Sequence, residues 1–149
     1  MNARTPNSFR SSAFHLARTG YVRGVRTAAL LGTHDGYIGR ELHLLGAHRV
    51  ELADWGPPGG ERYDLVVADL SPEVLGGRPV ERSIAQLHRL VGRNGRAAVV
   101  AGGMLERSHR ERVVAALKRR FDQVWSRMEA VPGGGYRVYI GAHFPKPKA

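Results

Sequence analysis

A glycine-rich loop near the amino terminus is the clearest candidate for chemistry in this chain. It consists of Gly32, Thr33, His34, Asp35 and Gly36. The glycines allow positive φ angles and let the backbone approach a ligand closely. The helix expected after the loop offers unpaired N–H groups to a carboxylate. The pattern therefore predicts either a ligand-binding turn or a tight connection that holds no ligand.

One acid and one tryptophan extend this candidate site. Asp54 ends an apolar run that begins at Arg49, and Trp55 is the next residue. The carboxylate of Asp54 either contacts a ligand or serves as a helix cap or a solvated charge. The indole of Trp55 either stacks on an adenine or covers the edge of the sheet, which is the commoner fate of a tryptophan.

The residue inventory excludes several reaction classes. The chain has no cysteine, so disulfides, thiolate zinc sites and cysteine nucleophiles are excluded. Its seven histidines show no recognisable ligand spacing, so no metal site is predicted. Ser71 has no evident histidine base, which argues against a hydrolase triad. No apolar run approaches the roughly 20 residues that a membrane span needs.

The elements that would position these residues alternate between strands and helices. Apolar runs predict strands over 27–31, 49–54, 63–70, 96–101, 124–131 and 136–144. Amphipathic segments predict helices over 37–45, 79–91 and 106–121. Such alternation requires parallel strands with right-handed crossovers. The last two strands are separated only by a short glycine loop at 133–135, so we expect them to pair antiparallel.

The glycine-rich loop lies where ligands bind in sheets of this kind. In an open α/β sheet, ligands bind beyond the carboxyl ends of the strands, at the point where the strand order reverses. The loop follows the first predicted strand directly. The two predictions, of a ligand loop and of its place in the sheet, therefore agree.

Residues 26–144 resemble the class I S-adenosylmethionine (SAM) methyltransferases. Leu30–Gly39 is similar to the glycine-rich first motif of that family, and Tyr63–Pro72 to its fourth-strand motif. Val91–Arg96 resembles the turn before its fifth strand, and Asp54 stands where its acid holds the ribose hydroxyls. The closing antiparallel hairpin also separates this family from the nucleotide-binding dehydrogenases, whose sheets end in parallel strands.

The resemblance implies a fold, a cofactor and a set of site residues. The fold is α/β, a three-layer Rossmann-like sheet that is mostly parallel and ends in an antiparallel C-terminal hairpin. The cofactor is SAM, held by Gly32, Thr33, His34, Asp35, Gly36, Asp54 and Trp55. The domain covers 26–144, preceded by a basic arm at 1–25 and followed by a tail at 145–149.

The chain departs from the family pattern at two structural positions. Leu30 or Leu31 replaces the acid that ends the family's first strand. Only eight residues, 55–62, separate the second predicted strand from the family's fourth. The third-strand region is therefore missing, together with its acid for the adenine amino group, and the sheet should be narrower.

No catalytic signature of the family is intact, and Asp69 is the single candidate catalytic residue. Asp69–Pro72 resembles the Asp/Asn-Pro-Pro-Tyr motif of amino-group methyltransferases, but Glu73 replaces the aromatic residue. Asp69 also matches an aspartate of the heat-shock-type 2′-O-methyltransferases of ribosomal RNA. The lysine partners of that aspartate are absent here.

The charge of the chain predicts a polyanionic partner. The formal net charge is +10, and arginine supplies 20 of the 23 basic residues. RNA, DNA and an anionic membrane are the options. The first 34 residues carry no acid, which is typical of a basic arm on an RNA-binding protein or of an organellar transit peptide. We therefore expect a cytoplasmic protein, with a mitochondrial location as the alternative.

Two functions remain open from the sequence. The first is a small SAM-dependent methyltransferase that acts on RNA through Asp69. The second is a catalytically inactive methyltransferase-like fold that binds RNA or serves in the assembly of a ribonucleoprotein. The glycine-rich loop and Asp54 favour the first, whereas the missing third-strand region and first-strand acid favour the second.

Overall fold

The computed structural model describes residues 24–32, 36–53, 55, 60–100, 107–130 and 136–147. Thr33, His34, Asp35 and Asp54 of the predicted site lie outside these residues, as does most of the predicted arm. No described helix is long and apolar enough to cross a membrane.

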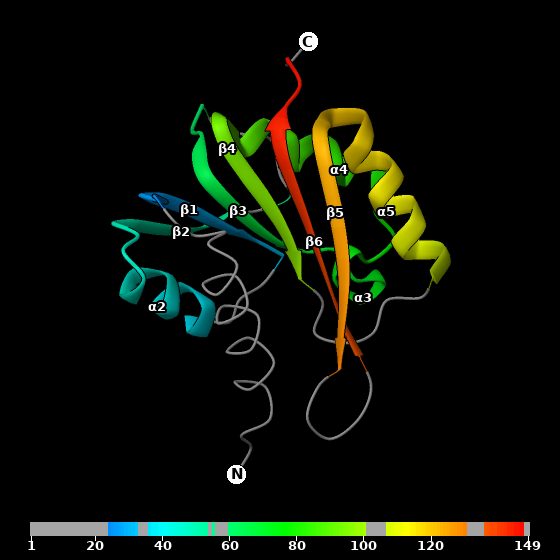
Figure 1. Cartoon of the computed structure of the whole chain (residues 1–149), viewed down its shortest axis with the longest axis horizontal. Helices are drawn as coiled ribbons and strands as arrows, with labels where there is room; N and C mark the ends of the chain where they lie inside the picture. The colour runs from blue at the N-terminus through cyan, green and yellow to red at the C-terminus, as the bar shows by residue number, and fades with distance from the viewer. Residues whose placement is uncertain are drawn as a thin grey trace.

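A mixed sheet of six strands forms the centre of the fold (Figure 1). Its strands run in the order β2-β1-β3-β4-β6-β5. β1 pairs parallel with β2 and β3, and β3 pairs parallel with β4. β6 is antiparallel to both β4 and β5. The strands are β1 (Thr27–Leu31), β2 (Arg49–Ala53), β3 (Tyr63–Asp69), β4 (Val91–Val100), β5 (Phe121–Ala130) and β6 (Tyr136–Pro145).

Helices cover both faces of this sheet and make it the middle of three layers. The helices are α2 (Gly36–Leu44), α3 (Pro72–Leu75), α4 (Val80–Leu90) and α5 (Arg107–Arg120). Alternate residues of β1 and β3 point to opposite faces, as the period of a strand requires. One set packs with α4 and α5 and the other with α2, and Figure 1 shows these helices on opposite sides. The predicted α/β architecture with an antiparallel C-terminal hairpin is confirmed.

The junction of α4 and β4 differs from the sequence prediction. The sequence predicted a helix over 79–91 and a strand only from residue 96, whereas β4 begins at Val91 directly after α4 ends. Tyr63 pairs with Val91 but Leu65 pairs with Arg96, so the intervening residues form a bulge. A Cβ on Gly95 would lie 2.6 Å from the Tyr63 carbonyl oxygen. A bulge packed this closely requires glycine at its crowded position.

The start of β5 also differs from the prediction. Phe121 was expected as the last inward-facing residue of the helix at 106–121, but it is the first residue of β5. Its side chain is nevertheless buried in the same core cluster as Val113 and Leu117 of α5. The apolar spacing correctly predicted burial of Phe121, but it did not distinguish the end of a helix from the start of a strand.

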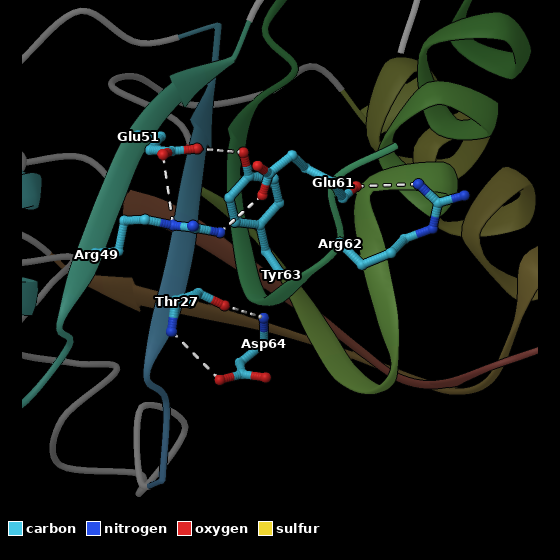
Figure 2. A network of polar contacts seen from close by, with 7 residues as sticks. All are labelled: Thr27, Arg49, Glu51, Glu61, Arg62, Tyr63 and Asp64. Atoms are coloured by element: carbon cyan, nitrogen blue, oxygen red, sulfur yellow. Dashed lines mark hydrogen bonds and ion pairs between the residues drawn. The ribbon is translucent and has the colours of Figure 1, made fainter. Parts of the chain in front are cut away.

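A polar network ties the outer strand β2 to β3 across β1 (Figure 2). The Tyr63 hydroxyl donates to Glu51 at 2.6 Å, and Arg49 pairs with Glu61 at 2.7 Å. Burial, followed by the hydrogen bond to Glu51, raises the pKa of Tyr63 to about 12. Asp64 accepts the backbone N–H of Thr27 at 3.2 Å, which joins the starts of β1 and β3.

Candidate functional site

The strand order reverses between β1 and β3, and this defines the candidate site. β2 lies on one side of β1, whereas the next strand along the chain, β3, lies on the other. Leu31 pairs with Ala68, so the residues that follow each strand are neighbours at the carboxyl edge. Ligand crevices of open α/β sheets form at such a reversal.

Gly32 lies at the centre of this edge in a conformation that favours glycine. Its φ is +81°, in the left-handed region. A Cβ here would lie 2.8 Å from Val74 Cγ1, 2.9 Å from the Asp69 carbonyl oxygen and 3.3 Å from Trp55 Cζ2. Gly32 therefore allows three separate segments of the chain to converge.

Asp69 ends β3 beside Gly32 and is almost completely buried. Only 8% of its surface is exposed. Its Oδ1 accepts the backbone N–H of Ser71 at 3.0 Å, a local bond that orients the carboxylate. The candidate catalytic residue of the sequence analysis thus lies at the strand reversal.

His109 anchors the backbone of Leu70, the residue that follows Asp69. His109 was not among the site residues predicted from the sequence. It lies in the first turn of α5 and is 5% exposed. Its Nε2–H donates to the carbonyl oxygen of Leu70 at 2.7 Å. The available signal was its spacing from Val113 and Ala116, which places all three on the buried face of α5.

Trp55 is half-buried beside Gly32 and carries an unsatisfied donor. Its ring packs against the core cluster on the α4–α5 face, and the Arg78 guanidinium carbon lies 5.8 Å from the ring centroid. Its Nε1–H is buried and has no hydrogen-bond partner among the described residues. A buried N–H without an acceptor is costly, so this atom suits a bound ligand that supplies one.

The structure brings together three of the residues singled out in the sequence. Gly32, Trp55 and Asp69 meet at the carboxyl edge of β1 and β3. Gly36 is the first residue of α2, at the helix end that was expected to face a carboxylate. The roles of all these residues in cofactor binding and catalysis stay predictions.

Basic side chains extend from this site along α5. Arg107 and Arg112 are exposed near His109, and Lys118 and Arg119 are exposed at the other end of the helix. Lys146 Nζ donates to the Lys118 carbonyl oxygen at 3.2 Å. Lys146 also lines a hollow of about 480 Å³ with Arg62, Arg93 and two prolines. We refer to these cations as the basic surface; those of α5 are spread along a helix about 21 Å long by the rise of its 14 residues, and Arg107 and Arg119 pair with Glu111 and Glu81.

Comparison with solved structures identifies the type of fold. No family model matches the chain, and no curated protein matches it. Magnesium protoporphyrin IX methyltransferase from Synechocystis, solved with SAM, is 14% identical with a TM-score of 0.61. That alignment covers 93% of this chain and 79% of the other. The plantazolicin methyltransferase, solved with S-adenosylhomocysteine, is 9% identical with a TM-score of 0.65, covering 94% and 86%.

A third similar structure is assigned as a ribosomal RNA methyltransferase from Plasmodium falciparum. It is 11% identical with a TM-score of 0.59, and the alignment covers 90% of this chain and 96% of the other. The fold of this chain is therefore that of the class I SAM-dependent methyltransferases. The resemblance seen in the sequence motifs is confirmed at the level of the fold.

Proposed function

We propose that this chain is a SAM-dependent methyltransferase that acts on RNA. The observation that carries the proposal is the buried Asp69 carboxylate at the strand reversal, beside Gly32 and at the start of the basic helix α5. This arrangement combines a candidate acceptor of protons, a place for the cofactor and a surface for a polyanion within one edge of the sheet.

The residues at this edge suit SAM. The unsatisfied Nε1–H of Trp55 is available to an oxygen of the cofactor. Gly32, Trp55 and the predicted residues Thr33, His34, Asp35, Gly36 and Asp54 would hold it. SAM supplies a methyl group on a positively charged sulfonium, so the methyl group is intrinsically ready for transfer. The protein then has mainly to orient the acceptor and exclude water.

Asp69 is suited to orient that acceptor. A carboxylate with its Oδ1 held by the Ser71 N–H accepts a hydrogen bond from a hydroxyl or amino group through its remaining lone pairs. In this position it would align the acceptor and take up its proton as the methyl group is transferred. His109 acts as a positioning residue, because it holds the Leu70 carbonyl next to Asp69.

The basic surface supports RNA as the substrate class. Arg112 and Lys118 of α5 form no ion pair with any carboxylate that the structure describes, so their charges are available to phosphate. Among the described residues, none that lines the hollow with Arg62, Arg93 and Lys146 is acidic. Guanidinium groups bind phosphate in a bidentate fork, which suits the arginine bias of the chain.

The alternative is an inactive methyltransferase-like fold that binds RNA as an assembly component. Two observations favour it. The side chains of Val74 and Trp55 already pack where Gly32 faces them. In addition, β2 is the outermost strand of the described sheet, so the wall that a third-strand region would provide is missing there. Both functions share the basic surface and differ in cofactor binding.

Calorimetric titration with SAM and S-adenosylhomocysteine distinguishes the two functions. Binding that weakens about tenfold in Trp55→Phe, which keeps an aromatic ring of smaller size but removes the N–H donor, supports the cofactor site. Absence of both heat and thermal stabilisation at millimolar ligand, with RNA binding retained, refutes the methyltransferase and leaves the assembly component.

Methyl transfer to RNA is then measured with labelled SAM. We expect Asp69→Asn to lower the rate by about 10²- to 10⁴-fold, the usual contribution of a proton-accepting group. Asp122→Asn, which changes an exposed acid of β5, is the matched control and should leave the rate unchanged. Equal rates in the two variants would remove Asp69 from the mechanism.

A further inference from the structure

The described sheet ends in two edge strands, β2 and β5, and β2 is the one next to the candidate site strand β1. β2 pairs with β1 on one side and with no described strand on the other. An edge strand with free N–H and C=O groups is a template for pairing with another strand. Natural edges are usually blunted by charge, proline or a covering element, yet Leu52 on this strand is 63% exposed.

Exposed leucines occur in the segment that contains the end of α2 and the strand β2. Four large apolar side chains of the described residues are exposed, and three of them are Leu44, Leu45 and Leu52. Leu44 ends α2, Leu45 follows it, and β2 begins four residues later at Arg49. Exposed apolar side chains next to an unpaired strand are typical of surfaces that bind a partner.

The two faces of β2 have different chemistry. Val50 and Leu52 face the α2 layer, where they line a hollow of about 390 Å³ whose other lining residues are Leu30, Gly39, Arg40, His43 and Glu51. Arg49 and Glu51 belong to the opposite face, in the network around Tyr63 that Figure 2 shows. The strand therefore presents apolar side chains on one face and an alternating pair of opposite charges on the other.

We propose that a second copy of this chain covers the edge by antiparallel pairing of β2 with β2, about a twofold axis at Val50. This register places Arg49 opposite the partner's Glu51, and the symmetry repeats that pair. Val50 then faces the partner's Val50. Leu52 lies opposite the partner's His48, next to the exposed leucines at the end of that subunit's α2.

Charge selects this register over its neighbours. A shift of two residues in one direction places Glu51 opposite the partner's Glu51, and in the other direction Arg49 opposite the partner's Arg49. Like charges directly opposite each other destabilise a strand pair, whereas opposite charges stabilise it. The Arg-x-Glu sequence of β2 is thus self-complementary in one antiparallel register, which favours a second copy over an unrelated strand.

The oligomeric state of the full chain tests the proposal. We expect sedimentation to show a concentration-dependent dimer, with association weakened about tenfold or more by Leu52→Lys. Phe144→Lys, which changes the fourth exposed apolar side chain, far from β2, is the matched control and should leave association unchanged. A monomer at the highest soluble concentration overturns the proposal, as does equal weakening by the two variants.

Cysteine crosslinking tests the register, because the chain has no cysteine of its own. Val50→Cys should form an intermolecular disulfide, since directly opposed residues have Cα atoms about 4.5–5.5 Å apart. Leu52→Cys should not crosslink, because the two copies of this residue are offset by four positions, roughly 13 Å. Crosslinking of the Leu52→Cys variant without crosslinking of the Val50→Cys variant would exclude this register. Binding of a different protein along β2 in place of a second copy would exclude the dimer.

Discussion

Replacement of Gly32 by alanine should destabilise the fold strongly. The left-handed backbone alone costs about 1–2 kcal/mol for a residue with a Cβ. The added methyl group would lie 2.8 Å from Val74 Cγ1 and 2.9 Å from the Asp69 carbonyl oxygen. Overpacking of this kind costs about 1–3 kcal/mol. We therefore expect a loss of about 2–5 kcal/mol in the free energy of unfolding.

Gly77→Ala is the control that separates the two contributions. Gly77 has a φ of +93°, but a Cβ there would meet no atom within 4 Å. This variant should lose only the backbone contribution, about 1–2 kcal/mol. Gly32→Ala combined with Val74→Ala removes one of the two close contacts and tests which neighbour resists the methyl group.

Denaturant unfolding monitored by circular dichroism measures these differences. A loss in Gly32→Ala no larger than that in Gly77→Ala would refute the close convergence of β1, β3 and α3 at the candidate site. A larger loss of stability in Gly32→Ala would support this convergence. Loss of SAM binding in the same variant would agree with a cofactor site at Gly32, but the stability difference alone tests the geometry.

Three further predictions follow from described contacts. His109→Ala should lower the free energy of unfolding by about 1–3 kcal/mol, because the buried Leu70 carbonyl loses its donor, and denaturant unfolding measures this. Tyr63 has a pKa of about 12 when folded against 10.0 normally, so the folded state retains its proton longer. The contribution of Tyr63 to the free energy of unfolding should be constant below pH 10 and fall between pH 10 and 12. Tyr63→Phe should remove this part of the pH dependence. RNA affinity should decrease steeply with salt. Arg112→Ala should lower the slope of log affinity against log salt concentration by about the amount expected for one phosphate contact. A flat salt dependence would exclude binding through phosphates.

The order of elements and the position of the candidate site could be read from the sequence. Period-two and period-3.6 apolar patterns are local, so they predicted the six strands and the helices α2, α4 and α5, but not the four-residue helix α3. The short loop at 133–135 allowed only an antiparallel hairpin, and the apolar run Leu65–Ala68 predicted a strand covered on both faces. The motifs around Gly32 and Asp69 placed both residues at strand ends, where the structure has them.

Element boundaries were less predictable from the same local patterns. The bulge before Arg96 depends on the register between β3 and β4, and Gly95 is required there because the Tyr63 carbonyl lies close. Phe121 is buried in either a helix or a strand, so its apolar character could not assign the element. The pairing between strands decides where each element begins and ends, and the sequence pattern of a single strand does not contain information about that pairing.

The sequence by itself determined the fold class, the strand reversal and the identity of Gly32 and Asp69 as candidate site residues. The family resemblance had already assigned Trp55 and Gly32 to one site, whereas only the tertiary structure showed how they pack and brought His109 to the carbonyl of Leu70, a residue 39 positions away in the chain. Among the residues that the structure describes, it also left the outer side of β2 without a paired strand and Leu52 exposed. Local patterns specify what each segment becomes, whereas contacts between distant segments depend on how the segments pack, and the candidate site is made of such contacts.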